Sequence, residues 1–206
     1  MPSTLQIDTI KDASASNTLF EQSGSDWKWG SGVPEGTVLQ VQNDILQGID
    51  SFATVGAGGA VNAAWQNSSL SIAITPKQTG SKMFITTNLR ASWDLADASI
   101  GVKITRHPAG GSEADVAVGT DTGSNRIAAN ANIYLGVLGS ALEIGTQLLD
   151  AGTVTAGTAI TYRVKCRSMD NPGSISLYLN RGESAYGDAN YVGTSTSSLT
   201  IFEVAQ

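Results

Sequence analysis

The residues that could perform acid–base or metal chemistry are carboxylates in turn-like stretches of the sequence. Two carboxylates facing one another across a sugar can cleave a glycosidic bond, and carboxylate oxygens can hold a calcium ion. Three pairs are spaced closely enough to be considered: Asp94 and Asp97, Asp115 and Asp121, and Glu183 and Asp188. Their spacing is that of ordinary turn acids. The sequence therefore predicts no catalytic residues and no metal-binding residues among them.

His107 is the only histidine of the chain and lies in "TRHPAGG", at the end of a predicted strand. A Ser-His-Asp triad, a two-histidine zinc site or a His–Cys pair is hard to build from one histidine in a turn. No G-x-S-x-G motif occurs, and "GAGGAV" at 56–61 places Val61 where a dinucleotide-binding loop needs its third glycine. We expect a protein that is not an enzyme and uses no cofactor.

The composition is typical of a β-rich protein, with 23 glycines and only 15% charged residues among 206. A net charge of −6 with scattered lysines and arginines excludes a nucleic-acid-binding or anionic-membrane-binding surface. No apolar stretch approaches the length of a membrane span, so no membrane insertion is expected. Cys166 has no partner for an internal disulfide, and the first residues lack the pattern of a signal peptide, so we expect synthesis in a reducing cytoplasm.

Apolar and polar residues alternate with period two in most of the chain after residue 36, which is typical of strands with one buried face. The clearest runs are "AITYRVKCRS" and "GSISLYLNR", separated by the turn-like "MDNPG". We interpret these two runs as a β-hairpin. The residues predicted to point inward from it are Ile160, Tyr162, Val164, Cys166, Ile175, Leu177 and Leu179.

The same alternation recurs in "SLSIAIT", "KMFITTNLRASW", "SIGVKITR" and "NIYLGVL". Together with "TVLQVQ" and "SLTIFEVA", these runs make about eight strands with polar turns between them. The predicted fold is an all-β, antiparallel, jelly-roll-like β-sandwich over 37–206, and a closed eight-stranded barrel is the alternative. The further inward positions are Leu70, Ile72, Ile74, Met83, Ile85, Leu89, Trp93, Ile100, Val102, Ile104, Ile133, Leu135 and Val137.

Residues 1–36 form a segment of different character, in which two short apolar runs, "TLQIDTI" and "NTLFEQ", precede "DWKWG". Too few apolar residues are present to build a core, so the segment must lie on its own sandwich, a sister subunit or a larger assembly. We interpret it as an extended N-terminal attachment arm and linker. The expected partner-anchoring residues are Leu5, Ile7, Leu19, Phe20, Trp27 and Trp29.

Two roles are open for Trp27 and Trp29, which stand where the arm meets the sandwich. They could clamp this junction against a partner, or one ring could cap the core of the chain's own sandwich. If the segment is extended, the two rings share one side and Lys28 points to the other.

The order of several short motifs resembles virion structural proteins of tailed bacteriophages, often called tail-fibre proteins. These motifs are "PSTLQIDTIKDASASNTL", "VPEGTVLQVQ", "SLSIAITPKQTGSKMFITTNL", the "TYRVKCRS" and "GSISLYLNRG" runs, and "GTSTSSLTIFEV". The resemblance covers nearly the whole chain. It implies a non-enzymatic, homotrimeric β-sandwich on the virion surface, made in the cytoplasm of a bacterial host. It also implies attachment to other virion proteins, of the tail or the capsid, through the N-terminal arm.

Three functions follow as hypotheses. The first is a short tail fibre or spike, in which Tyr186, Asp188 and Tyr191 of "ESAYGDANYVGTSTS" could stack against a host surface polysaccharide. The second is a capsid decoration, or cement, protein whose arm staples neighbouring capsid subunits. The third is a polysaccharide-degrading enzyme, which the absence of a catalytic motif disfavours. Arm deletion separates the first two, because a fibre would lose tail attachment and a cement protein would leave a fragile shell.

Overall fold

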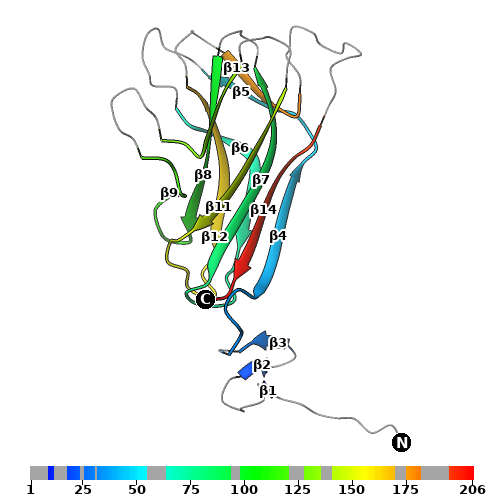
Figure 1. Ribbon diagram of the computed structural model, residues 1–206, viewed down its shortest axis with the longest axis vertical. Coiled ribbons are helices and arrows are strands. Elements are labelled where there is room, and N and C mark those ends of the chain that lie inside the picture. The colour runs from blue at the N-terminus through cyan, green and yellow to red at the C-terminus, as the bar shows by residue number, and fades with distance from the viewer. Residues whose placement is uncertain are drawn as a thin grey trace, which may run out of the picture.

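The computed structural model describes residues 9–11, 18–23, 26–30, 32–54, 64–93, 98–120, 128–135, 141–169, 175–181 and 195–206. Every regular element within these ranges is a β-strand, and all strand pairs are antiparallel. No helix that could cross a membrane occurs in them. Figure 1 shows an elongated two-layered body with a small separate sheet beyond one end.

Eight long strands build the body as two packed sheets. One sheet has the order β4-β14-β7-β11 and the other the order β6-β12-β8-β10. The strands are β4 (Val38–Leu46), β6 (Gln66–Ile74), β7 (Lys82–Trp93), β8 (Ala98–Pro108), β10 (Ala131–Leu135), β11 (Leu142–Asp150), β12 (Ile160–Ser168) and β14 (Ser197–Val204).

The pairing of these strands is nested. The first of the eight pairs with the last, the second with the seventh, the third with the sixth and the fourth with the fifth. A chain that forms one long hairpin and then rolls that hairpin up gives this order, which is the jelly roll. The predicted fold class is confirmed. The described strands show no ladder joining the two sheets, so the closed barrel is wrong.

Shorter strands complete the molecule. β5 (Asp50–Thr54) and β13 (Ile175–Leu179) extend the first sheet at the end where β7 reaches Trp93. β9 (Ala114–Asp115) pairs with the edge of β8. The N-terminal segment forms a three-stranded sheet of its own in the order β1-β2-β3. Its strands are β1 (Thr9–Lys11), β2 (Thr18–Ser23) and β3 (Asp26–Trp29).

The core lies between the two sheets and is built from the alternating apolar positions of both. From the two longest runs, Ile160, Tyr162, Val164, Cys166, Leu177 and Leu179 are buried as predicted. The inward positions on β6, β7 and β8 are also buried, and Ile133 packs partly against the core. The side chains of Leu135 and Ile175, and all of Val137, lie outside the described residues.

The predicted hairpin between 160–168 and 175–179 is wrong. β12 pairs with β6 and β8, whereas β13 pairs with β5 and β7 in the opposite sheet. The chain therefore crosses from one sheet to the other between these strands. Alternation fixes which face of a strand is buried, and both sheets bury one face. It therefore cannot tell in which sheet the next strand pairs.

The prediction also missed β11, which pairs with β7 over its whole length. In its sequence, "LEIGTQLLD", two positions depart from the alternation of inward apolar and outward polar residues. Thr146 is buried on the inner face, where its hydroxyl bonds that of Thr87 at 2.7 Å, and Leu149 is exposed on the outer face. A polar residue inside and an apolar residue outside make the period-two signal of this strand weak.

Candidate interaction surfaces

The arm sheet lies beyond the end of the sandwich that holds the C-terminus (Figure 1). Its central strand is β2, in which Phe20 stands opposite Ile10 of β1 and Trp29 of β3. Ile10 is 42% exposed, and Leu19 and Phe20 are half-buried. A sheet with an apolar face buries that face against another element. Among the described elements, no strand outside the arm pairs with it.

The chain leaves the arm sheet through a close backbone contact at Gly30. Its N–H donates to the carbonyl of Leu19, and the N–H of Gly32 donates to the carbonyl of Thr18, each at 2.8 Å. A Cβ atom on Gly30 would lie 2.1 Å from the Thr18 carbonyl oxygen. Only glycine allows this approach, so Gly30 fixes how the chain turns away from the arm.

Val33, Leu39 and Ala205 form the junction between arm and sandwich, as a small buried cluster separate from the main core. The N–H of Gly36 donates to the Ala205 carbonyl, and the N–H of Ala205 donates to the Thr37 carbonyl, both at 2.9 Å. Val33 therefore anchors the described part of the junction. The backbone at Trp27 and Trp29 is extended, but their side chains lie outside the description.

A second candidate surface is the outer face of the β4-β14-β7-β11 sheet. Four apolar residues stand side by side across it: Val41 is in register with Phe202, Phe202 with Phe84, and Phe84 with Leu149. The rings of Phe84 and Phe202 lie 6.1 Å apart between centroids. Leu149 is 52% exposed, Val41 48% and Phe84 36%. We call these four residues the apolar row.

The apolar row lies near the arm end of the sandwich. The next positions toward the arm are Val38 and Val204, which are in register with one another, and Val38 is 46% exposed. A contiguous exposed apolar patch on a sheet is uncommon on a monomeric protein and marks a surface that binds something. Parity along each strand places these residues outward, but the period of the single strands does not reveal that four strands align them.

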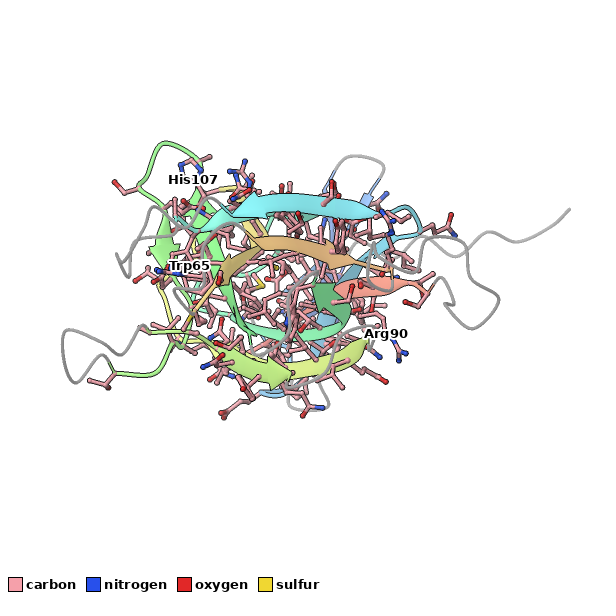
Figure 2. The ribbon with its side chains drawn as sticks, turned by 90° about the horizontal axis from the view of Figure 1, so that it is seen from above. Trp65, Arg90 and His107 are labelled. Atoms are coloured by element: carbon pink, nitrogen blue, oxygen red, sulfur yellow. The ribbon has the colours of Figure 1, made fainter. Side chains whose placement is uncertain are left out.

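The outer face of the other sheet is covered differently. Trp65 lies beside two cations, with Lys103 Nζ 4.7 Å and Arg167 Cζ 5.6 Å from its ring. Lys103 also pairs with Asp115 of β9 at 2.7 Å. Figure 2 labels Trp65 and His107 on one side of the molecule and Arg90 on the other. Because these cations already have partners, this cluster stabilises β9 on the sheet rather than presenting free charges.

Some of the residues considered for chemistry lie in the described part of the structure, and these have structural roles. Asp115 is held by Lys103, and His107 Nε2 lies 3.0 Å from the Gly111 carbonyl oxygen. Within the described ranges, no group of three or more His, Cys, Asp or Glu residues could hold a metal ion. The residues that lie outside the described part are Asp94, Asp97, Asp121, Glu183 and Asp188.

Sequence analysis missed Glu203, a fully buried carboxylate on the inner face of β14. It accepts hydrogen bonds from the backbone N–H groups of Lys77 and Gln78 at 2.8 to 3.0 Å, from the Ser81 hydroxyl at 2.8 Å and from the Gln40 amide at 2.6 Å. These donors compensate its lost hydration. Glu203 therefore holds the turn between β6 and β7. In the sequence, such a group is indicated by a charged residue at an inward-facing position of a strand.

A second buried polar group joins Tyr162, Asp150 and Arg106. The Tyr162 hydroxyl donates to Asp150 Oδ2 at 2.7 Å, and Arg106 Nε lies 3.0 Å from the same oxygen. Burial, and then the hydrogen bond to Asp150, raise the pKa of the Tyr162 phenol well above its usual value. This tyrosine is therefore a neutral donor at physiological pH, and its hydrogen bond ties β12 to the end of β11.

The predicted site residues are only partly described. Leu19 and Phe20 are consecutive residues of β2, so their side chains leave opposite faces of the arm sheet. The predicted residues that lie outside the description are Leu5, Ile7, Tyr186, Asp188 and Tyr191. The anchoring role of the arm and the glycan-stacking set are therefore still predictions.

No family model and no curated relative matches this chain. The solved structures that align with it include two of infectious bursal disease virus. One, of the Gx strain, is 14% identical, with a TM-score of 0.36, over 92% of this chain and 43% of that chain. The other, a mutant VP2 protein in derived T=1 particles, is 12% identical, with a TM-score of 0.38, over 100% of this chain and 44% of that chain. This chain spans less than half the length of either, and similarity this distant assigns neither a family nor a function.

Proposed function

We propose that this chain is a non-enzymatic structural protein of a virion, carried on the particle surface and attached to other virion proteins through its N-terminal arm. The observation that carries the proposal is the arm sheet. It stands outside the sandwich, its three strands pair with one another, and it presents Ile10 at 42% exposure. Another layer over this surface would bury its apolar residues and stabilise the sheet.

The virion as the place of attachment is supported by the resemblance of the ordered sequence motifs to tailed-phage structural proteins. The jelly roll is compatible with this role, because it occurs in viral structural proteins as well as in lectins and enzymes. The absence of a catalytic motif in the sequence supports a role in assembly. Among the virion locations, a short tail fibre or spike is the function that we propose first.

The arm itself provides the test. The double variant Trp27→Ala and Trp29→Ala, and separately Phe20→Asp, should be introduced into the virus that encodes this chain. We expect purified wild-type particles to contain the chain by mass spectrometry, and particles of either variant to have lost most of it. Ile49→Asp, a change of an exposed residue in the turn after β4, is the control and should leave incorporation unchanged.

Two outcomes would overturn parts of the proposal. If the chain is absent from purified wild-type particles, the virion role is wrong. If arm variants are incorporated normally, the arm is not the attachment device. Labelling the C-terminus and imaging particles distinguishes the locations: label at the tail supports a fibre, whereas label over the shell, with shells that break on loss of the arm, supports a decoration protein.

A further inference from the structure

The outer face of the β4-β14-β7-β11 sheet is organised in rows that run across the four strands. The apolar row comes first at the arm end. The next row consists of Asn43, Thr200, Thr86 and Gln147, all polar and uncharged, with Thr200 bonded to Asn43 at 2.9 Å. The third contains Ile45, Ser198, Asn88 and Gly145. Three successive rows thus carry no charge in a protein with 30 ionisable Lys, Arg, Asp and Glu residues, 12 plus 18.

Charges on this face are confined to its two ends. Lys82 stands beside Val204 at the arm end, and Arg90 stands opposite Glu143 at the other end. Two positive charges and one negative charge give the face a net charge of +1, whereas the chain as a whole carries −6. An uncharged centre with charges at the rim is the composition of a protein–protein interface. A net charge this small on the face does not oppose its contact with a second copy of this acidic chain.

The size of the face suits one side of such an interface. Nine residues of strand length and four strands of width give a flat area on the order of 500 to 600 Å². The relief of the side chains makes the accessible area larger than this. A standard protein–protein interface buries about 800 Å² on each partner.

From these observations we infer that the outer face of the β4-β14-β7-β11 sheet binds a second copy of this chain. The apolar row forms a dry strip at the arm end of the contact, and the uncharged polar rows extend it. Arg90 and Glu143 place a positive and a negative charge at the rim. Each of these charges can therefore face the opposite charge on an identical chain. The inference does not depend on the proposed attachment to a virion, because it concerns the purified chain alone.

The oligomeric state of the purified full chain tests the inference. Sedimentation is measured at protein concentrations from about 1 to 100 μM. This range detects association at the weak end of the affinities that interfaces of this size have. We expect wild-type protein to be oligomeric, with a mass that also tests the homotrimer that the resemblance implies. Leu149→Asp should weaken association about 100-fold or more, because it places a charge in the apolar row, which the contact keeps dry. Ile49→Asp is the matched control, with 51% exposure against 52% for Leu149, and should change association less than threefold.

Thiol labelling gives a second measurement that needs no disruptive substitution. Cys166 is fully buried, and burial raises the pKa of its thiol to about 12, so it contributes little background. Asn88→Cys places a thiol in the third, uncharged row of the face, and Ala73→Cys places one on the exposed side of β6 in the opposite sheet. In the oligomer, we expect a maleimide to label position 88 at least tenfold more slowly than position 73.

Three results would overturn the inference: a wild-type chain that is monomeric throughout this concentration range, an oligomer that Leu149→Asp and Ile49→Asp affect equally, or equal labelling of positions 88 and 73 in the oligomer. If Leu149→Asp fails to fold, which exposure of Cys166 to the maleimide would reveal, the labelling comparison decides.

Discussion

Asp44 on β4 and Ser71 on β6 join the two sheets directly: Asp44 Oδ2 accepts a hydrogen bond of 2.9 Å from the Ser71 backbone N–H. Asp50 of β5 does the same for Ser69, accepting from its N–H and its hydroxyl at 2.6 Å each. β6 is the edge strand of its sheet, so these N–H groups have no strand to pair with. Carboxylates from the facing sheet therefore satisfy an edge that could otherwise recruit another chain.

Removing these acceptors should destabilise the sandwich and expose the β6 edge. We expect Asp44→Ala and Asp50→Ala each to lower the free energy of unfolding by about 1 to 2 kcal/mol, because each leaves an edge N–H without its acceptor. The double variant should also aggregate faster at high concentration. Urea unfolding and light scattering measure the two effects. Asn43→Ala, on the exposed face of β4, is the control, and a double variant as stable as this control would contradict the edge role.

Glu203 should be far more sensitive to substitution than an exposed glutamate, because it is fully buried. Glu203→Gln replaces one acceptor oxygen with an NH₂ group facing backbone N–H donors. We expect a loss of about 2 to 4 kcal/mol in the free energy of unfolding, since the turn donors are left unpaired in a buried site. Glu143→Gln makes the same chemical change at an exposed residue and should cost less than about 0.5 kcal/mol. Similar unfolding midpoints in urea for the two variants would refute this role.

Tyr162 should make stability depend on pH in alkaline solution. Its pKa is raised in the folded protein, so the folded state keeps a proton that the unfolded phenol releases above about pH 10. The stabilisation is therefore complete below pH 10 and is lost as the pH rises further, with a slope of up to about 1.4 kcal/mol per pH unit.

The variant Tyr162→Phe isolates this effect. At pH 8 it should be less stable than wild type by about 1 to 2 kcal/mol, because the hydrogen bond to Asp150 is lost. Between pH 10 and 11 the difference should shrink, since phenylalanine does not titrate. Urea unfolding of both proteins at pH 8, 10 and 11 measures it, and parallel pH profiles would show that Tyr162 titrates normally.

Gly30 should matter for the arm and not for the sandwich. In Gly30→Ala the new Cβ would collide with the Thr18 carbonyl, so the exit from β3 must move and the bonds at Gly30 and Gly32 should break. We expect faster hydrogen exchange at these two N–H groups by at least tenfold, with the melting temperature of the sandwich unchanged. Gly48→Ala has open space around its Cβ and serves as control. Unchanged exchange at positions 30 and 32 would show that the arm sheet tolerates a side chain there.

The period of the sequence determined which side of most strands is buried. Ile72, Ile104 and Cys166 point inward because a strand presents alternate residues to the core, whatever it pairs with. This local rule is why the all-β class and most of the core could be predicted without a structure. It failed at Thr146 and Leu149, where a buried hydroxyl pair and an exposed leucine reverse the pattern.

Only the tertiary structure decided which strands are neighbours. Val41, Phe84, Leu149 and Phe202 are far apart in the sequence, and the antiparallel registers of four strands place them in one row. Other contacts also join segments that are distant in the sequence. Glu203 bonds the turn at Lys77 and Gln78, and Asp44 bonds Ser71. Pairing depends on contacts between distant segments, whose free energies the local pattern does not contain. The candidate surfaces of this protein are therefore products of its topology.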